Sequence, residues 1–75
     1  MDELIQILEE INPDIDYKTE TKLIDGKIFD SFDIITIISE INEVFDVAIP
    51  AEEIIPENFN SAAAIWALIE KLDEA

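Results

Sequence analysis

Apolar residues recur at three- and four-residue spacing in three stretches of the chain, and this spacing predicts helices. The first helix runs from about Asp2 to Ile11 and ends there because Pro13 disfavours helical backbone at Asn12. The second runs from about Phe32 to Phe45, with Ser31 as its N-cap. The third runs from about Ala62 to Leu72, and Asn60 or Ser61 caps it. Two inward stripes are expected: Leu4, Ile5, Ile7, Leu8 and Ile11 in the first helix, and Ile65, Leu68, Ile69 and Leu72 in the last, where Ala62 permits close packing.

A long connection from Asp14 to Asp30 separates the first two helices, and Asp25-Gly26 marks a turn within it. Its apolar anchors are Ile15, Tyr17, Leu23, Ile24, Ile28 and Phe29. After a break at Asp46 to Pro50, Ala51 to Ile55 can form one short turn of helix before Pro56. We therefore expect one all-α domain over residues 1–75, a small bundle of three main helices plus one short helix.

Composition supports a folded domain and narrows its chemistry. An apolar content of 49% is enough for a core, and the 16 isoleucines, which favour strands, are outweighed by the helical spacing. The chain lacks Cys, His and Arg, which removes thiol nucleophiles, imidazole bases and the usual zinc ligands. The acidic run that begins at Asp14 fails as a calcium loop because Lys18 and Thr19 stand where a ligand and a glycine are needed. No metal site and no intrinsic enzyme activity are expected.

The net charge of −15 bears on partners. Such a surface repels nucleic-acid backbones and anionic membranes, so neither nucleic acid nor membrane insertion is expected, and partners should present Lys/Arg-rich patches. Alternatively, the acidity only keeps a small protein soluble. The N-terminal residues lack the basic and apolar segments of a signal peptide, and no stretch is long enough to span a membrane. We expect a cytoplasmic monomer.

The second helix has two apolar faces. Its core stripe lies within about 60° of one direction and comprises Ile34, Ile37, Ile38, Ile41, Val44 and Phe45. On the same wheel Ile35 points about 120° away from this stripe and Phe32 about 180° away. Asp33, Glu40 and Glu43 flank this second face, as in a docking surface for a partner with an apolar notch and basic surroundings. Alternatively, Phe32 folds back under the long connection.

Ser31 stands at the start of this helix, where a serine is most often only an N-cap. No histidine is present to activate it as a nucleophile. The helix N-terminus would favour a phosphate ester on Ser31, although Asp30 and Asp33 partly oppose that charge.

These residues carry a family resemblance. The run Asp30-Ser31-Phe32-Asp33, an amphipathic helix closing in Glu43-Val44-Phe45, and the following Ile49-Pro50 resemble an acyl carrier protein over nearly the whole chain. The usual residue after the serine is Leu or Met, and Phe32 replaces it here. The segment from Glu53 to Ala62 is also similar to that of D-alanyl carrier proteins, which serve an adenylating ligase.

The resemblance implies a carrier that is not itself an enzyme. Ser31 would bear a 4′-phosphopantetheine arm from coenzyme A, attached by a phosphopantetheinyl transferase, and Asp30 would help that enzyme and its metal locate the serine. The arm would hold an acyl or aminoacyl group as a thioester. Phe32 and Ile35 with the charged rim of Asp33, Glu40 and Glu43 would dock the transferase, the loading ligase and downstream transferases.

Two alternatives remain open at the level of sequence. The cargo could be D-alanyl or another aminoacyl group loaded by an adenylating ligase. More remotely, the chain could be an acidic helical interaction module without a prosthetic group.

Overall fold

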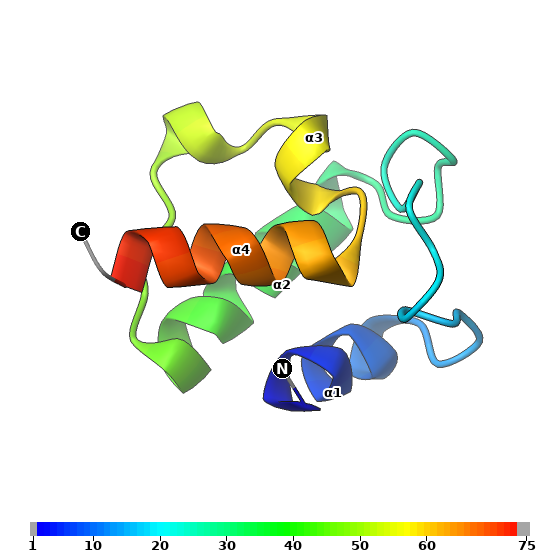
Figure 1. Cartoon of the computed structure of the whole chain (residues 1–75), viewed down its shortest axis with the longest axis horizontal. Helices are drawn as coiled ribbons and strands as arrows, with labels where there is room; N and C mark the ends of the chain where they lie inside the picture. The colour runs from blue at the N-terminus through cyan, green and yellow to red at the C-terminus, as the bar shows by residue number, and fades with distance from the viewer. Residues whose placement is uncertain (1, 74–75) are drawn as a thin grey trace.

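The computed structural model describes residues 2–73, which fold into a bundle without strands (Figure 1). Its elements in chain order are α1 (Asp2–Ile11), α2 (Ser31–Phe45), the 3₁₀ turn η1 (Ala51–Glu53), α3 (Pro56–Phe59) and α4 (Ala62–Asp73). Three of the helices are long and α3 has only four residues. The predicted all-α small bundle is confirmed.

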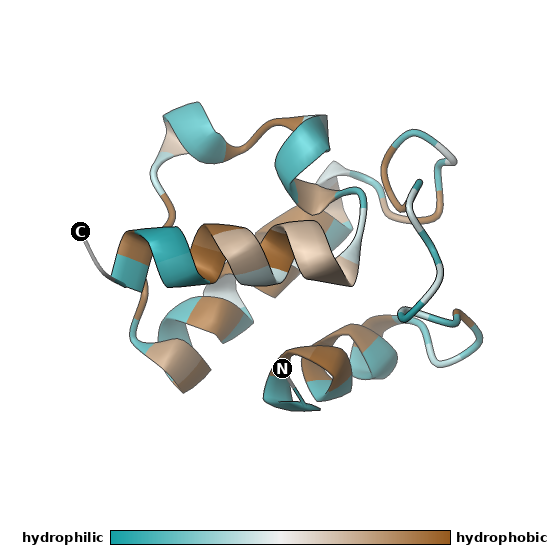
Figure 2. Cartoon of the chain, viewed as in Figure 1, coloured by the Kyte–Doolittle hydropathy of each residue, from teal (hydrophilic) through white to brown (hydrophobic). Residues whose placement is uncertain are grey.

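The core forms where α1 packs against both α2 and α4. In Figure 2, α1 and α2 carry both hydrophobic (brown) and hydrophilic (teal) residues along their length, whereas α4 is brown and tan over its N-terminal part and teal only towards its C-terminal end. The inward stripes of α1 and α4 are buried largely as predicted, with Ile5, Ile11 and Leu72 partly buried at their margins. In α2 the residues Ile37 and Ile41 are fully buried, which confirms the orientation of its core face. Burial of these stripes is the main stabilising term for such short helices.

Val44 departs from the predicted stripe, because its side chain is 45% exposed. It lies in the last turn of α2, two residues before the left-handed C-cap residue Asp46 (φ 56°). The next residue, Phe45, packs edge-to-face on Trp66 of α4 with ring centroids 5.7 Å apart, so the last turn still contacts the bundle and only Val44, at the margin of the stripe, is left exposed.

The segment after α2 differs from the prediction in one respect. A turn does form at Ala51–Glu53, but Pro56 begins the helix α3 rather than ending a helical turn. Proline suits the first turn of a helix, since its missing N–H needs no partner there. The ion pair between Lys71 Nζ and Glu53 Oε2, at 3.0 Å, links η1 to the last turn of α4.

The long connection between α1 and α2 lies at one end of the bundle (Figure 1) and is held to it by buried side chains. Tyr17, Leu23 and Phe29 are buried, and Ile15, Ile24 and Ile28 pack against the core, so all six predicted anchors are used. The predicted turn at Asp25-Gly26 is present, with Gly26 N donating to Lys22 O at 2.7 Å. A Cβ at position 26 would lie 2.6 Å from that carbonyl oxygen, so the turn requires glycine.

Candidate functional site

Ser31 is the first residue of α2 and is exposed, but it is not the N-cap. Asp30 takes that role: Asp33 N donates to Asp30 Oδ1 at 2.9 Å, and Asp30 N donates to Asp33 Oδ2 at 3.4 Å. Both residue types cap helices well, and the extended backbone of Asp30 (φ −100°, ψ −175°) decides between them. The predicted N-cap was therefore wrong by one residue.

This correction changes the chemistry open to Ser31. The hydroxyl oxygen of a serine N-cap would accept a hydrogen bond from a backbone N–H of the first turn. Because Asp30 caps α2, the Ser31 hydroxyl lies at an exposed helix N-terminus and does not make the capping hydrogen bond. The dipole of α2 favours negative charge there, while the Asp30 and Asp33 carboxylates oppose it.

The second apolar face of α2 is exposed, as the wheel predicts. Phe32 is 75% exposed and Ile35 is 65% exposed, so Phe32 does not fold back under the connection. Thr36 Oγ1 donates to Phe32 O at 3.1 Å and so satisfies its own polar group within the helix. Large apolar side chains left in water one and four residues after Ser31 indicate a contact surface rather than a core element.

Carboxylates accompany this apolar pair, and no basic residue lies in α2. Glu43 is exposed, and Asp33 and Glu40 are partly exposed. Three of the four lysines lie instead in the connection between α1 and α2, and the fourth, Lys71, is paired with Glu53. The face of α2 is therefore a uniformly acidic surface around an apolar centre.

Two further exposed apolar residues, Ile54 and Ile55, lie between η1 and α3 and were not singled out from the sequence. They are 40% and 43% exposed. Their sequence signal is an apolar pair between two acids and Pro56, in a segment too short to form a helical stripe of its own.

The backbone that leads into the site is anchored by an aromatic pair. Phe29 is buried and stacks on Tyr17, with ring centroids 6.1 Å apart. The single proton of the Tyr17 hydroxyl is shared between the carbonyl oxygens of Leu8 (2.9 Å) and Asn12 (2.6 Å) at the end of α1. Burial, followed by the charges of Glu9 and Asp33, raises the pKa of Tyr17 to about 12. The tyrosine is thus a neutral structural anchor below strongly alkaline pH.

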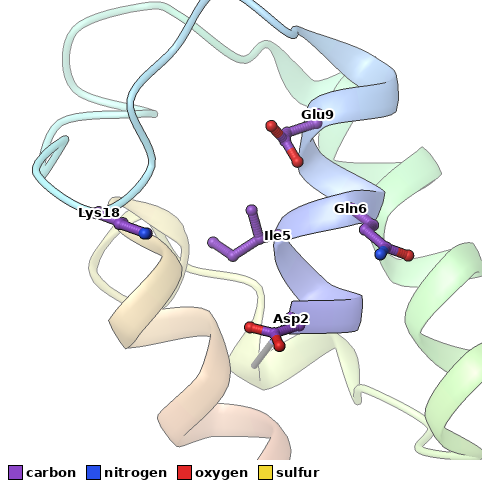
Figure 3. Close-up of a pocket in the computed structure, with 5 residues that line it drawn as sticks. All are labelled: Asp2, Ile5, Gln6, Glu9 and Lys18. Carbon is purple, nitrogen blue, oxygen red and sulfur yellow. The ribbon is translucent and has the colours of Figure 1, made fainter.

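An open hollow lies between α1 and the connection, away from the predicted site (Figure 3). Asp2, Ile5, Gln6 and Glu9 of α1 line it together with Lys18, and Ile5 points towards Lys18 in the close-up. It contains none of the residues predicted from the sequence to bind or dock.

Within residues 2–73, no group of three or more acidic side chains is arranged to hold a metal ion. In the same residues, no helix has the length and apolar character needed to cross a membrane.

Comparison with models of known protein families found no match, and neither did comparison with curated proteins or with solved structures.

Proposed function

We propose that the protein is a carrier that holds an acyl or aminoacyl group on a 4′-phosphopantetheine arm attached to Ser31. The observation that carries the proposal is the combination at the start of α2: an exposed serine that does not cap its helix, followed by the exposed Phe32 and Ile35. The resemblance of Asp30-Ser31-Phe32-Asp33 and its spacing to Phe45 and Pro50 points the same way.

The residues present fit such a prosthetic group. Ser31 is accessible to a modifying enzyme, and its attachment point at a helix N-terminus suits the phosphate of the arm. When bound, the group supplies a terminal thiol, which this cysteine-free chain lacks, and holds the cargo as a thioester. Asp30 fixes the first turn of α2 as its cap and presents a carboxylate beside the serine.

The chain's own contribution is docking. Phe32 and Ile35 offer apolar area, and Asp33, Glu40 and Glu43 attract the basic patches of a phosphopantetheinyl transferase, a loading ligase and downstream transferases. The reaction chemistry lies with those enzymes, because a serine without a neighbouring base is not a self-activated nucleophile. We place this exchange in the cytoplasm.

The experiment is intact-mass measurement after incubation with coenzyme A and a broad-specificity phosphopantetheinyl transferase. The wild type should gain the mass of one phosphopantetheine and Ser31→Ala should gain none. Ser39→Ala is the matched control, since Ser39 is an exposed serine eight residues along the same helix. An unmodified wild type would leave the acidic interaction module as the better explanation of the charge.

Loading assays then separate the two kinds of cargo. Incubation of the modified protein with an adenylating ligase, ATP and D-alanine should yield an aminoacyl thioester if the similarity of residues 53–62 to D-alanyl carriers is functional. Loading by a fatty acyl ligase instead would assign an acyl cargo.

A further inference from the structure

One side chain far from Ser31 in the sequence holds the segment that leads into it. Asn60, at the C-terminal end of α3, makes four hydrogen bonds to the connection between α1 and α2. Its backbone oxygen accepts from Leu23 N at 2.9 Å, and its Oδ1 accepts from Ile24 N and Asp25 N, both at 3.0 Å. Its Nδ2 donates to Asp25 Oδ2 at 3.0 Å.

The same contacts continue towards the candidate site. Leu23, whose N–H donates to the backbone oxygen of Asn60, accepts with its carbonyl oxygen from Ile28 N (3.0 Å) and Phe29 N (2.9 Å). Any residue at position 60 keeps that backbone bond, so the Asn60 side chain acts through the neighbouring Ile24 and Asp25. Leu23 and Phe29 are both buried, so the turn between them is fixed at its two ends. Phe29 directly precedes Asp30, the cap of α2, and Ser31 follows.

We propose that Asn60 is a positioning residue for Ser31: by fixing residues 23–29 against the α3–α4 junction, it sets where the Asp30-Ser31 segment is presented to a modifying enzyme. The test by phosphopantetheine transfer to Ser31 rests on the function proposed above, whereas the positioning of residues 23–29 by Asn60 is a property of the fold.

The chemistry of the Asn60 side chain is specific to this role. Its oxygen faces two N–H donors and its amino group faces a carboxylate, so the network itself assigns the orientation of the amide. An aspartate at position 60 could still accept from both N–H groups, but it would set a second carboxylate against that of Asp25. Only a side chain with an acceptor and a donor satisfies all three partners.

The first test compares Asn60→Ala with Asn58→Ala. Asn58 is a matched control, because it is partly exposed like Asn60 and its Nδ2 bonds only within its own segment, to Glu53 O at 2.7 Å. In Asn60→Ala the amide protons of Ile24 and Asp25 should exchange faster with solvent, and the NMR amide shifts of residues 30–33 should change. In Asn58→Ala both should stay as in the wild type.

Transferase kinetics give the functional readout. Every docking side chain is still present in Asn60→Ala, and Ile35, Glu40 and Glu43 lie outside residues 30–33. The KM should therefore stay within about twofold of the wild-type value, while kcat falls about tenfold because the serine is less well placed. Asn60→Asp should show a smaller fall in kcat, because it keeps an acceptor for both N–H groups and loses only the bond to Asp25.

Rescue by exchange of the two side chains completes the design. Combining Asn60→Asp with Asp25→Asn keeps the charge and restores the side-chain bond with donor and acceptor reversed, so kcat and amide protection should recover together. The rescue requires no contact with the enzyme, which a docking role for Asn60 would need.

The outcomes divide as follows. Unchanged exchange at Ile24 and Asp25, a rise in KM without a fall in kcat, or a double variant no better than Asn60→Asp overturns the proposal. A wild type that is never modified contradicts the carrier function alone. In that case the amide shifts of residues 30–33 still decide whether Asn60 positions them, and no change in those shifts would refute it.

Discussion

Asp30 and Asp33 cap α2 reciprocally, each carboxylate accepting from the backbone N–H of the other. The two aspartates satisfy backbone N–H groups at the start of the helix, and Ser31 between them does not. Asp30→Ala should therefore lower the free energy of unfolding by about 0.5–2 kcal/mol, the usual effect of losing an N-cap. Ser31→Ala should cost less than Asp30→Ala. Urea unfolding of the two variants checks this order. A greater loss of unfolding free energy in Ser31→Ala than in Asp30→Ala would mean that Ser31 is the N-cap.

Alkaline pH should weaken the fold through Tyr17. Its pKa is raised to about 12 in the fold, against about 10 in an unfolded chain, so the folded state binds the proton more tightly. The resulting stabilisation is complete below pH 10 and is lost as the pH rises from 10 to 12. Because the chain has a single tyrosine, ultraviolet titration of tyrosinate measures the shift directly.

The control for this pH effect is Tyr17→Phe. It removes the hydroxyl proton that Leu8 O and Asn12 O share, so at pH 8 it should be less stable by roughly 0.5–1.5 kcal/mol. The stability difference from the wild type should narrow between pH 10 and 12. A difference that stays constant over that range would mean that the hydroxyl titrates normally in the fold.

Phe32 should matter for binding and not for folding. Since its side chain is 75% exposed, Phe32→Ala should change the free energy of unfolding by no more than about 0.5 kcal/mol. Phe59→Ala, at a buried phenylalanine, should cost about 3–5 kcal/mol in the same measurement. On a cognate transferase or ligase, Phe32→Ala should speed dissociation by an amount equivalent to roughly 1.5–3 kcal/mol if the ring is fully buried on docking. If Phe32→Ala dissociates from the enzyme at the wild-type rate, Phe32 is not part of the docking surface.

Charge reversal on α2 should act on association. Replacing Glu40 and Glu43 by Lys should slow association with a basic partner enzyme and reduce its dependence on salt, because charges at the rim of an interface act mainly on encounter. Reversal of Glu3 and Glu10 on α1 makes the same change in net charge away from this face. Equal effects of the two double variants in stopped-flow binding would indicate that only net charge matters.

Two neighbouring positions in the connection should respond to substitution with opposite signs. Gly26→Ala should destabilise the fold, since the new Cβ meets Lys22 O at 2.6 Å. Lys27→Gly should stabilise it by up to about 1 kcal/mol, because Lys27 adopts a left-handed backbone with φ 60° that glycine adopts without strain. Thermal unfolding of both variants tests the pair. If Lys27→Gly destabilises the fold, the Lys27 side chain contributes more stability than its left-handed backbone costs.

The sequence by itself determined the elements whose signals are local. The start and end of α1, the end of α2 at Phe45 and the inward stripes of α1 and α4 follow from apolar spacing, caps and Pro13. The outward direction of Phe32 and Ile35 was also predictable, because the 3.6-residue repeat fixes the angle between side chains of one helix.

Tertiary structure decided what depends on residues distant in the chain. Whether Asp30 or Ser31 caps α2 depends on the backbone angles at the junction, where the preceding Phe29 is buried and stacks on Tyr17. The exposure of Val44, at the margin of its stripe, depends on which neighbouring elements cover that margin. Asn60 was a candidate helix cap in the sequence, yet Ser61 Oγ accepts from Ala64 N at 3.0 Å and takes that role. Asn60 instead bonds to Asp25, 35 residues away, and a contact over such a distance exists only once the helices have packed and brought the two side chains together.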